Sequence, residues 1–100
     1  MSGAPINVMG GLMRDIALAV ARRHSMSLDA MCAPTRARPF AYARQEAMYL
    51  MVKEDRWSLP RIGMFFGKDH TTVLHGARAH ERRLKEAQAR DLAAWNGLAA

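Results

Sequence analysis

The sequence has a single cysteine, Cys32, among its 100 residues. One cysteine excludes an internal disulfide and a zinc site built from several cysteines. No apolar run approaches the ~20 residues that a membrane span needs, and residues 1–20 make a poor secretory signal because Arg14 and Asp15 interrupt their most apolar part. The length suits one small domain and excludes most large enzyme architectures. We therefore expect a soluble, cytoplasmic protein of one domain.

Acidic residues are also few, with 9 Asp and Glu against 15 Lys and Arg, which gives a net charge of +6. Residues 36–85 hold eleven of the basic and five of the acidic residues, so this segment carries a charge equal to that of the whole chain. Half of the residues are hydrophobic and 24% are charged, which is typical of a globular protein. The charge indicates a polyanionic partner that meets the second half of the chain.

No segment alternates as a strand does, and there is no internal repeat, so the sequence predicts an all-α fold. Apolar residues recur at helical spacing over roughly residues 11–24 and again from about 41 to 56. Ser27 can cap a short helix that runs through Met31. Residues 33–39, bracketed by two prolines, form a predicted basic loop.

The next segment predicts a helix-turn-helix. Ser58 is a capping residue, and Pro60 stands in the first turn of the helix, where its missing N–H costs nothing. This helix should end at Gly67, which suits the left-handed position after a helix. Asp69 then caps a last helix over about residues 70–89. We expect residues 1–10 to be a flexible tail, residues 11–90 one domain, and residues 91–100 an alanine-rich tail.

The first turn of the second helix is the part of a helix-turn-helix that reaches base edges. Asp69 can accept a hydrogen bond from the amine of cytosine, and His70 can bond a purine edge. The methyl groups of Thr71 and Thr72 suit thymine methyls, while their hydroxyls suit phosphate. Lys68 adds a point charge beside the backbone. The alternative is that these residues form an ordinary helix cap and nothing more.

Three blocks of this sequence carry a resemblance: Arg44 to Leu50 (RQEAMYL), Ser58 to Gly63 with Phe66-Gly67, and Asp69 to His75 (DHTTVLH). They resemble the C-terminal DNA-binding domain of the bacterial replication initiator DnaA, which reads RQxAMYL, SLPxIGxxFG and RDHTTVxHA. The resemblance covers roughly residues 11–85. It implies a Trp-repressor-like helical fold that binds double-stranded DNA, with DnaA-box-like sites as candidate targets.

The resemblance also implies the role of each site residue. The base contacts are Asp69, His70 and Thr71. Arg36 and Arg38, in the basic loop, are the candidates for the minor groove. The phosphate contacts are Arg44, Gln45, Ser58, Leu59, Pro60, Lys68 and Thr72.

This sequence departs from the family pattern in four places. The turn is one residue shorter, and Lys68 stands where the family has arginine, so the base register is an open question. Glu46 and His80 replace residues that are apolar in the family. No GxxxxGK[ST] phosphate loop is present, so we expect no ATPase. The spacing suggests no Ser/His/Asp or Cys/His arrangement either, so we expect no other enzyme.

We expect no cofactor and no metal, because His70, His75 and His80 are spaced by five and diverge around a helix. His75 should be a packed or capping residue and His80 half-buried. The methionines, including Met48, Met51 and Met64, should fill the core or its edge.

The predicted function is a DNA-binding regulator of transcription or replication, associated with the nucleoid, from a bacterium or a phage. The main alternative is a protein-interaction module that binds a protein partner through the methionine-rich first helix and Trp95. A second copy of the chain is a separate candidate partner. Trp95 itself either packs against that first helix or anchors a partner. A basic helix on a membrane surface is a weaker third possibility, because the charge gathers on the loop and the motif.

Overall fold

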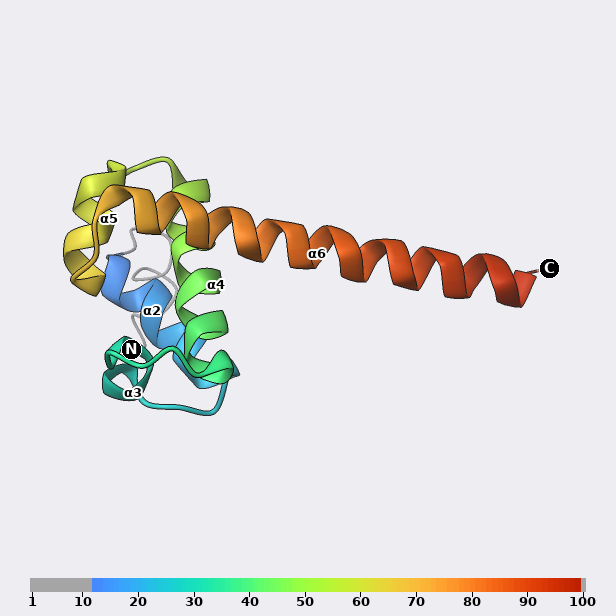
Figure 1. Ribbon diagram of the computed structural model, residues 1–100, viewed down its shortest axis with the longest axis horizontal. Coiled ribbons are helices and arrows are strands. Elements are labelled where there is room, and N and C mark those ends of the chain that lie inside the picture. The colour runs from blue at the N-terminus through green and yellow to red at the C-terminus, as the bar shows by residue number, and fades with distance from the viewer. Residues whose placement is uncertain (1–11, 100) are drawn as a thin grey trace, which may run out of the picture.

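The computed structural model describes residues 12–99, which form helices and contain no strand (Figure 1). The helices are α2 (Met13–Arg23), α3 (Leu28–Cys32), α4 (Arg38–Glu54), α5 (Leu59–Phe66) and α6 (His70–Ala99). The all-α prediction is confirmed. The predicted tail over residues 1–10 lies outside the described residues. Within the described part, no helix has the length and apolarity to cross a membrane.

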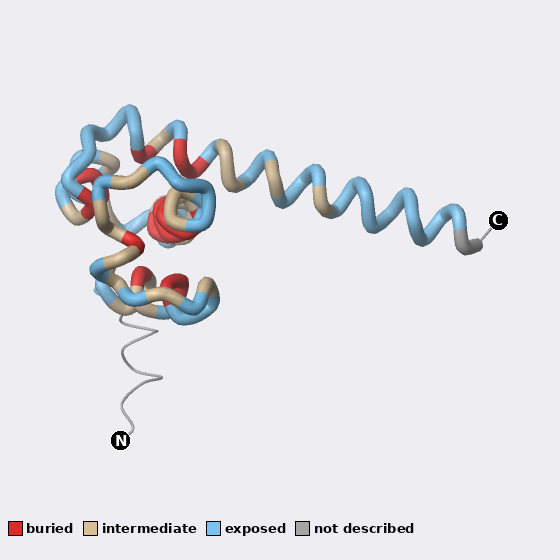
Figure 2. Tube along the Cα trace, turned by 60° about the horizontal axis from the view of Figure 1, so that its bottom comes forward, coloured by how far each residue is buried: buried red, intermediate tan, exposed pale blue. Residues whose placement is uncertain are grey.

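Helix α4 is the centre of the packing, because α2, α3, α5 and the first part of α6 all contact it. Its buried face carries Ala43, Ala47, Met48 and Met51, and the buried residues of the chain gather around it (Figure 2). The neighbouring helices complete the core with Ala17, Val20, Ala21, Met31, Ile62, Phe66 and Val73. Burial of these side chains is the main source of stability.

The predicted core positions of Met48 and Met51 are confirmed, but the prediction for Met64 is wrong. Met64 is 81% exposed, because α5 turns Ile62, Gly63 and Phe66 inward. Position 64 therefore falls on the outer side of a short helix.

His80 is half-buried, as predicted, and marks the place where α6 leaves the domain. Its ring lies against Tyr49 of α4, with the ring centroids 5.0 Å apart. Burial is the main reason that the pKa of His80 is lowered, with the nearby Arg83, Arg23 and His24 acting in the same direction and Glu46 opposing them. The neutral imidazole therefore suits the packed position.

A buried carboxylate joins α2 to α4. The side chain of Glu46 is 5% exposed; its Oε1 lies 2.8 Å from Nε2 of His24, and its Oε2 lies 2.8 Å from Nη1 of Arg23. Both partners stand at the end of α2, 22 or more residues earlier in the chain. Glu46, which stands where the family pattern has an apolar residue, is thus paired rather than left as an isolated charge in the core.

Two helix boundaries differ from the predictions. Helix α4 begins at Arg38 rather than near residue 41, because proline is tolerated in a first turn and Pro39 lies there. Helix α6 continues to Ala99, about ten residues beyond its predicted end. Alanine is the best helix former, and the alanine-rich segment offers no proline to stop the helix. The second half of α6 extends away from the other helices (Figure 1).

Candidate nucleic-acid interface

The turn between α5 and α6 is built as the sequence predicts. Ser58 caps α5, since its Oγ accepts a hydrogen bond from the N–H of Arg61 at 3.2 Å. Gly67 has φ +66°, in the left-handed region, and the N–H of Lys68 donates to the carbonyl of Gly63 at 2.9 Å. This pattern is a Schellman end. Gly63 is required here, because an added Cβ would collide with the carbonyl oxygen of Lys68.

The candidate reading head is the start of α6. Asp69 caps the helix: its Oδ1 accepts a hydrogen bond from the N–H of Thr72 at 2.8 Å. That bond is the main reason that the pKa of Asp69 is lowered, so the group is a carboxylate at neutral pH. Asp69, His70, Thr71 and Thr72 are all exposed. Asp69 is thus a helix cap, and its carboxylate, which accepts several hydrogen bonds, can also accept one from a DNA base.

Four of the predicted phosphate contacts meet around one recess between α4 and α6. This recess has a volume of about 440 Å³ and a mixed polar and apolar lining. Its polar lining residues are Arg44, Gln45, Lys68, Thr72, His75 and Arg82. The Oε1 atom of Gln45 is buried there without a hydrogen-bond partner. A cationic recess beside an exposed helix start suits the sugar-phosphate backbone of a nucleic acid.

Sequence reasoning missed the part that His75 takes in this recess. His75 is exposed and lines the recess, so the prediction that it is packed is wrong. The signal was present, because Thr72, His75, Ala79 and Arg82 recur every three or four residues and so share one face of α6.

Arg44 is largely buried and holds the basic loop between α3 and α4. Its Nη1 donates to the carbonyl oxygens of Met31 at 2.8 Å and Ala33 at 3.0 Å, and its Nη2 donates to the carbonyl oxygen of Thr35. Three of the five N–H groups of the guanidinium are thus used on the end of α3 and the loop after it. Arg44 therefore acts first by fixing the backbone next to Arg36 and Arg38.

The remaining predicted contacts lie outside the recess. Arg36 stands in the loop that Arg44 holds, and Arg38 is the first residue of α4; both are exposed. Ser58 and Pro60 are exposed at the start of α5, and Leu59 is half-buried. None of these five residues lines the recess.

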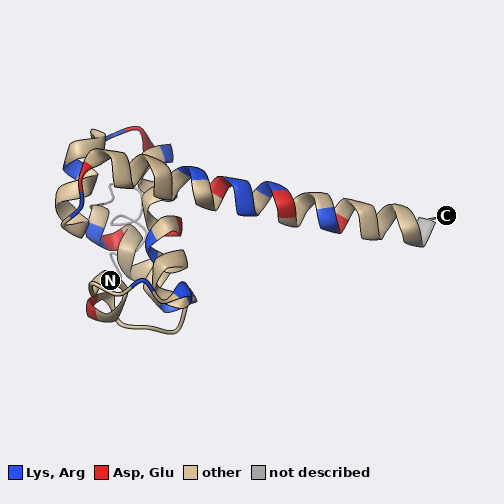
Figure 3. Ribbon diagram, in the orientation of Figure 1, with Lys and Arg blue, Asp and Glu red and all other residues tan. Residues whose placement is uncertain are grey.

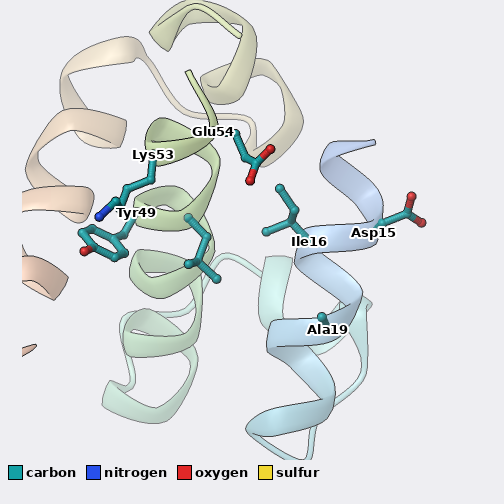
Figure 4. A pocket seen from close by; sticks show the side chains of 7 residues that line it. Asp15, Ile16, Ala19, Tyr49, Lys53 and Glu54 are labelled. Carbon is teal, nitrogen blue, oxygen red and sulfur yellow. The ribbon is translucent and has the colours of Figure 1, made fainter. Parts of the chain in front are cut away.

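A second hollow lies between α2 and α4, with a volume of about 530 Å³ (Figure 4). Ile16, Ala19 and Leu50 give it an apolar wall, and its charged residues are Asp15, Lys53 and Glu54. We call it the α2–α4 groove. It holds none of the predicted site residues.

The comparisons with known proteins identify the family of this chain. The family model described as the bacterial dnaA protein helix-turn-helix matches residues 13–79. The chain belongs to this family. It therefore has the helix-turn-helix domain of DnaA proteins, a DNA-binding domain, and the 100 residues do not contain the ATPase region.

Similar curated proteins are full-length initiators. The chromosomal replication initiator protein DnaA of Roseobacter denitrificans is 42% identical over 78 residues, which are 76% of this chain and 17% of that protein. The protein of the same name from Cereibacter sphaeroides is 43% identical over 70 residues, 69% of this chain and 15% of that protein. The chain thus spans about a sixth of the length of these relatives. No solved structure matches it significantly.

Proposed function

We propose that this chain binds double-stranded DNA sequence-specifically and regulates transcription or replication in the bacterial cytoplasm, at the nucleoid. The start of α6 enters the major groove, and the loop between α3 and α4 enters the adjacent minor groove. The observation that carries the proposal is the cationic recess directly beside the exposed, capped start of α6. DnaA-box-like sequences are the first candidates for the target, since the chain is similar to DnaA initiators.

In this proposal the residues divide by chemistry. Asp69, His70 and Thr71 present hydrogen-bonding groups and a methyl group to base edges. Gln45, Lys68 and Thr72, around the recess, contact phosphates, as do the first residues of α5, Ser58, Leu59 and Pro60. Arg44 contributes by holding the loop so that Arg36 or Arg38 reaches the minor groove.

Basic residues continue along α6 beyond the recess (Figure 3). Arg82 lines the recess itself, and Arg83 lies over the ring of Tyr42, 3.9 Å from its centroid. Stacking on an aromatic ring orients a guanidinium. These arginines extend the positive surface from the reading head along the helix and supply further backbone contacts.

The test of the proposal is the salt dependence of duplex binding. If about five phosphates are neutralised, the logarithm of the association constant should fall linearly with the logarithm of the salt concentration, with a slope near −4.5. Fluorescence anisotropy with a labelled duplex measures this slope. A flat response would remove DNA as the main partner.

The loop arginines give a second prediction. Replacing Arg36 and Arg38 together with alanine should weaken binding most on sites with A/T-rich flanks, because a narrow minor groove concentrates negative potential there. Arg14→Ala with Arg22→Ala is the matched control, since it removes the same charge from exposed positions on α2. Anisotropy on duplexes that differ only in their flanks measures the difference. Equal losses on all flanks would mean that these arginines contact phosphate alone.

A further inference from the structure

The C-terminal half of α6 has no packing partner within the described residues. From Leu84 to Ala99 it extends about 24 Å beyond the domain at 1.5 Å per residue. It carries large apolar side chains that are exposed to solvent: Leu84 is 38% exposed, Leu92 60% and Trp95 66%. The exposure of Trp95 excludes the alternative that it packs against α2. The family match ends at residue 79, so this segment lies beyond the matched residues.

Two of these apolar residues, Leu84 and Trp95, share one stripe of the helix with two polar residues. Leu84, Gln88, Asp91 and Trp95 recur every three or four residues and fall within an arc of about 60° at 3.6 residues per turn. This is the spacing of a coiled-coil seam. Ala87 and Ala94 flank the stripe on one side, and Lys85 and Leu92 flank it on the other. Small residues beside a seam allow close approach of a second helix.

We propose that residues 84–95 pair antiparallel with the same residues of a second copy of this chain. The polar residues of the stripe select this occupant and this direction. In a parallel pair in register, Asp91 would face Asp91 across the seam, and like charges at such a position oppose pairing. In an antiparallel pair, Leu84 faces Trp95, and Gln88 faces Asp91, so that the amide donates to the carboxylate.

The same register also matches the flanks. Ala87 lies opposite Ala94, and the aliphatic stem of Lys85 lies beside Leu92. The remaining charges of the segment, Glu86 and Arg90, stand away from the seam by their positions on the helical wheel. The whole pair is therefore self-complementary, as a two-fold interface requires.

The antiparallel pair places the two reading heads at opposite ends of the dimer. The starts of the two α6 helices point in opposite directions, about 60 Å apart at 1.5 Å per residue. If the chain binds DNA as proposed above, the dimer holds two separate duplex segments. The pairing itself does not depend on DNA binding and is tested without DNA.

The first experiment measures the mass of the full chain by sedimentation equilibrium over a range of concentrations. We expect twice the chain mass of 11.2 kDa for the unaltered protein and for Ala93→Asp, which places its charge on the opposite face of the helix. Trp95→Asp should give the monomer. A monomer for the unaltered chain at millimolar concentration, or a dimer that tolerates Trp95→Asp, would overturn the proposal.

The second experiment tests direction. In a Cys32→Ser background, Ala87→Cys and Ala94→Cys chains are oxidised separately and as a mixture. The antiparallel register predicts disulfide dimers chiefly in the mixture, each joining one chain of the first variant to one chain of the second. Efficient dimers of each variant with itself would indicate a parallel pair and overturn the register.

A third variant tests the other place where Trp95 could bind a second copy, which is the α2–α4 groove. Ala19 lines that groove and is exposed, so Ala19→Asp should leave the dimer intact if the pairing is between α6 helices. A dimer lost with Ala19→Asp assigns Trp95 to the groove and refutes the helix pair.

Discussion

Replacing Arg23 and His24 together with alanine should lower the free energy of unfolding by about 3 kcal/mol, at the lower end of the range for a broken buried ion pair. The carboxylate of Glu46 would lose both Arg23 and His24, each at 2.8 Å, while remaining among the buried residues of α4. The lower end applies because Arg23 is mostly exposed, and water screens an exposed charge. Urea denaturation followed by circular dichroism measures the loss.

Adding Glu46→Leu to the same double variant should restore most of that stability. An apolar residue of similar volume often replaces a buried ion pair at little or no cost, whereas removing one side of the pair leaves a buried charge. Arg14→Ala with Arg22→Ala controls for the loss of two basic groups from α2. If the triple variant is as unstable as the double one, the loss comes from contacts of Arg23 and His24 other than those with Glu46.

The sequence predicts local structure well here because the deciding chemistry is local. Ser27 caps α3, with its Oγ 3.0 Å from the N–H of Ala30, and Ser58, Gly67 and Asp69 act at the predicted helix ends. Each of these residues acts on backbone within three or four positions. The end of α6 differs from its prediction because the segment lacks such a signal.

Long-range partners could not be predicted in the same way. Arg44 binds carbonyls 9 to 13 residues earlier in the chain, and Glu46 binds residues on α2. Such contacts follow from how α2, α3 and α4 pack. Motif reasoning located the charged surface but gave Arg44 only a phosphate role, and it placed His75 among the packed or capping residues although His75 lines the recess.

The reading head gives the prediction with the largest effect on recognition. A site is first selected from random duplexes with the unaltered chain. His70→Ala should then weaken binding to that site by about 1–3 kcal/mol and hardly change binding to random DNA, because an imidazole at a base edge loses its partner when the base changes. His70 is exposed at the first position of α6, so its replacement leaves the core intact.

Lys68→Ala is the matched variant, two residues away and also exposed. Its ammonium lines the recess with Thr72 and Arg82, where it would contact phosphate and ignore sequence. Binding to selected and random DNA should weaken by a similar factor, and the magnitude of the salt slope should fall by about one. Selection repeated with His70→Ala completes the test. If it returns the same motif with the same strength, the start of α6 does not read bases, and the shortened turn has moved recognition elsewhere on the surface.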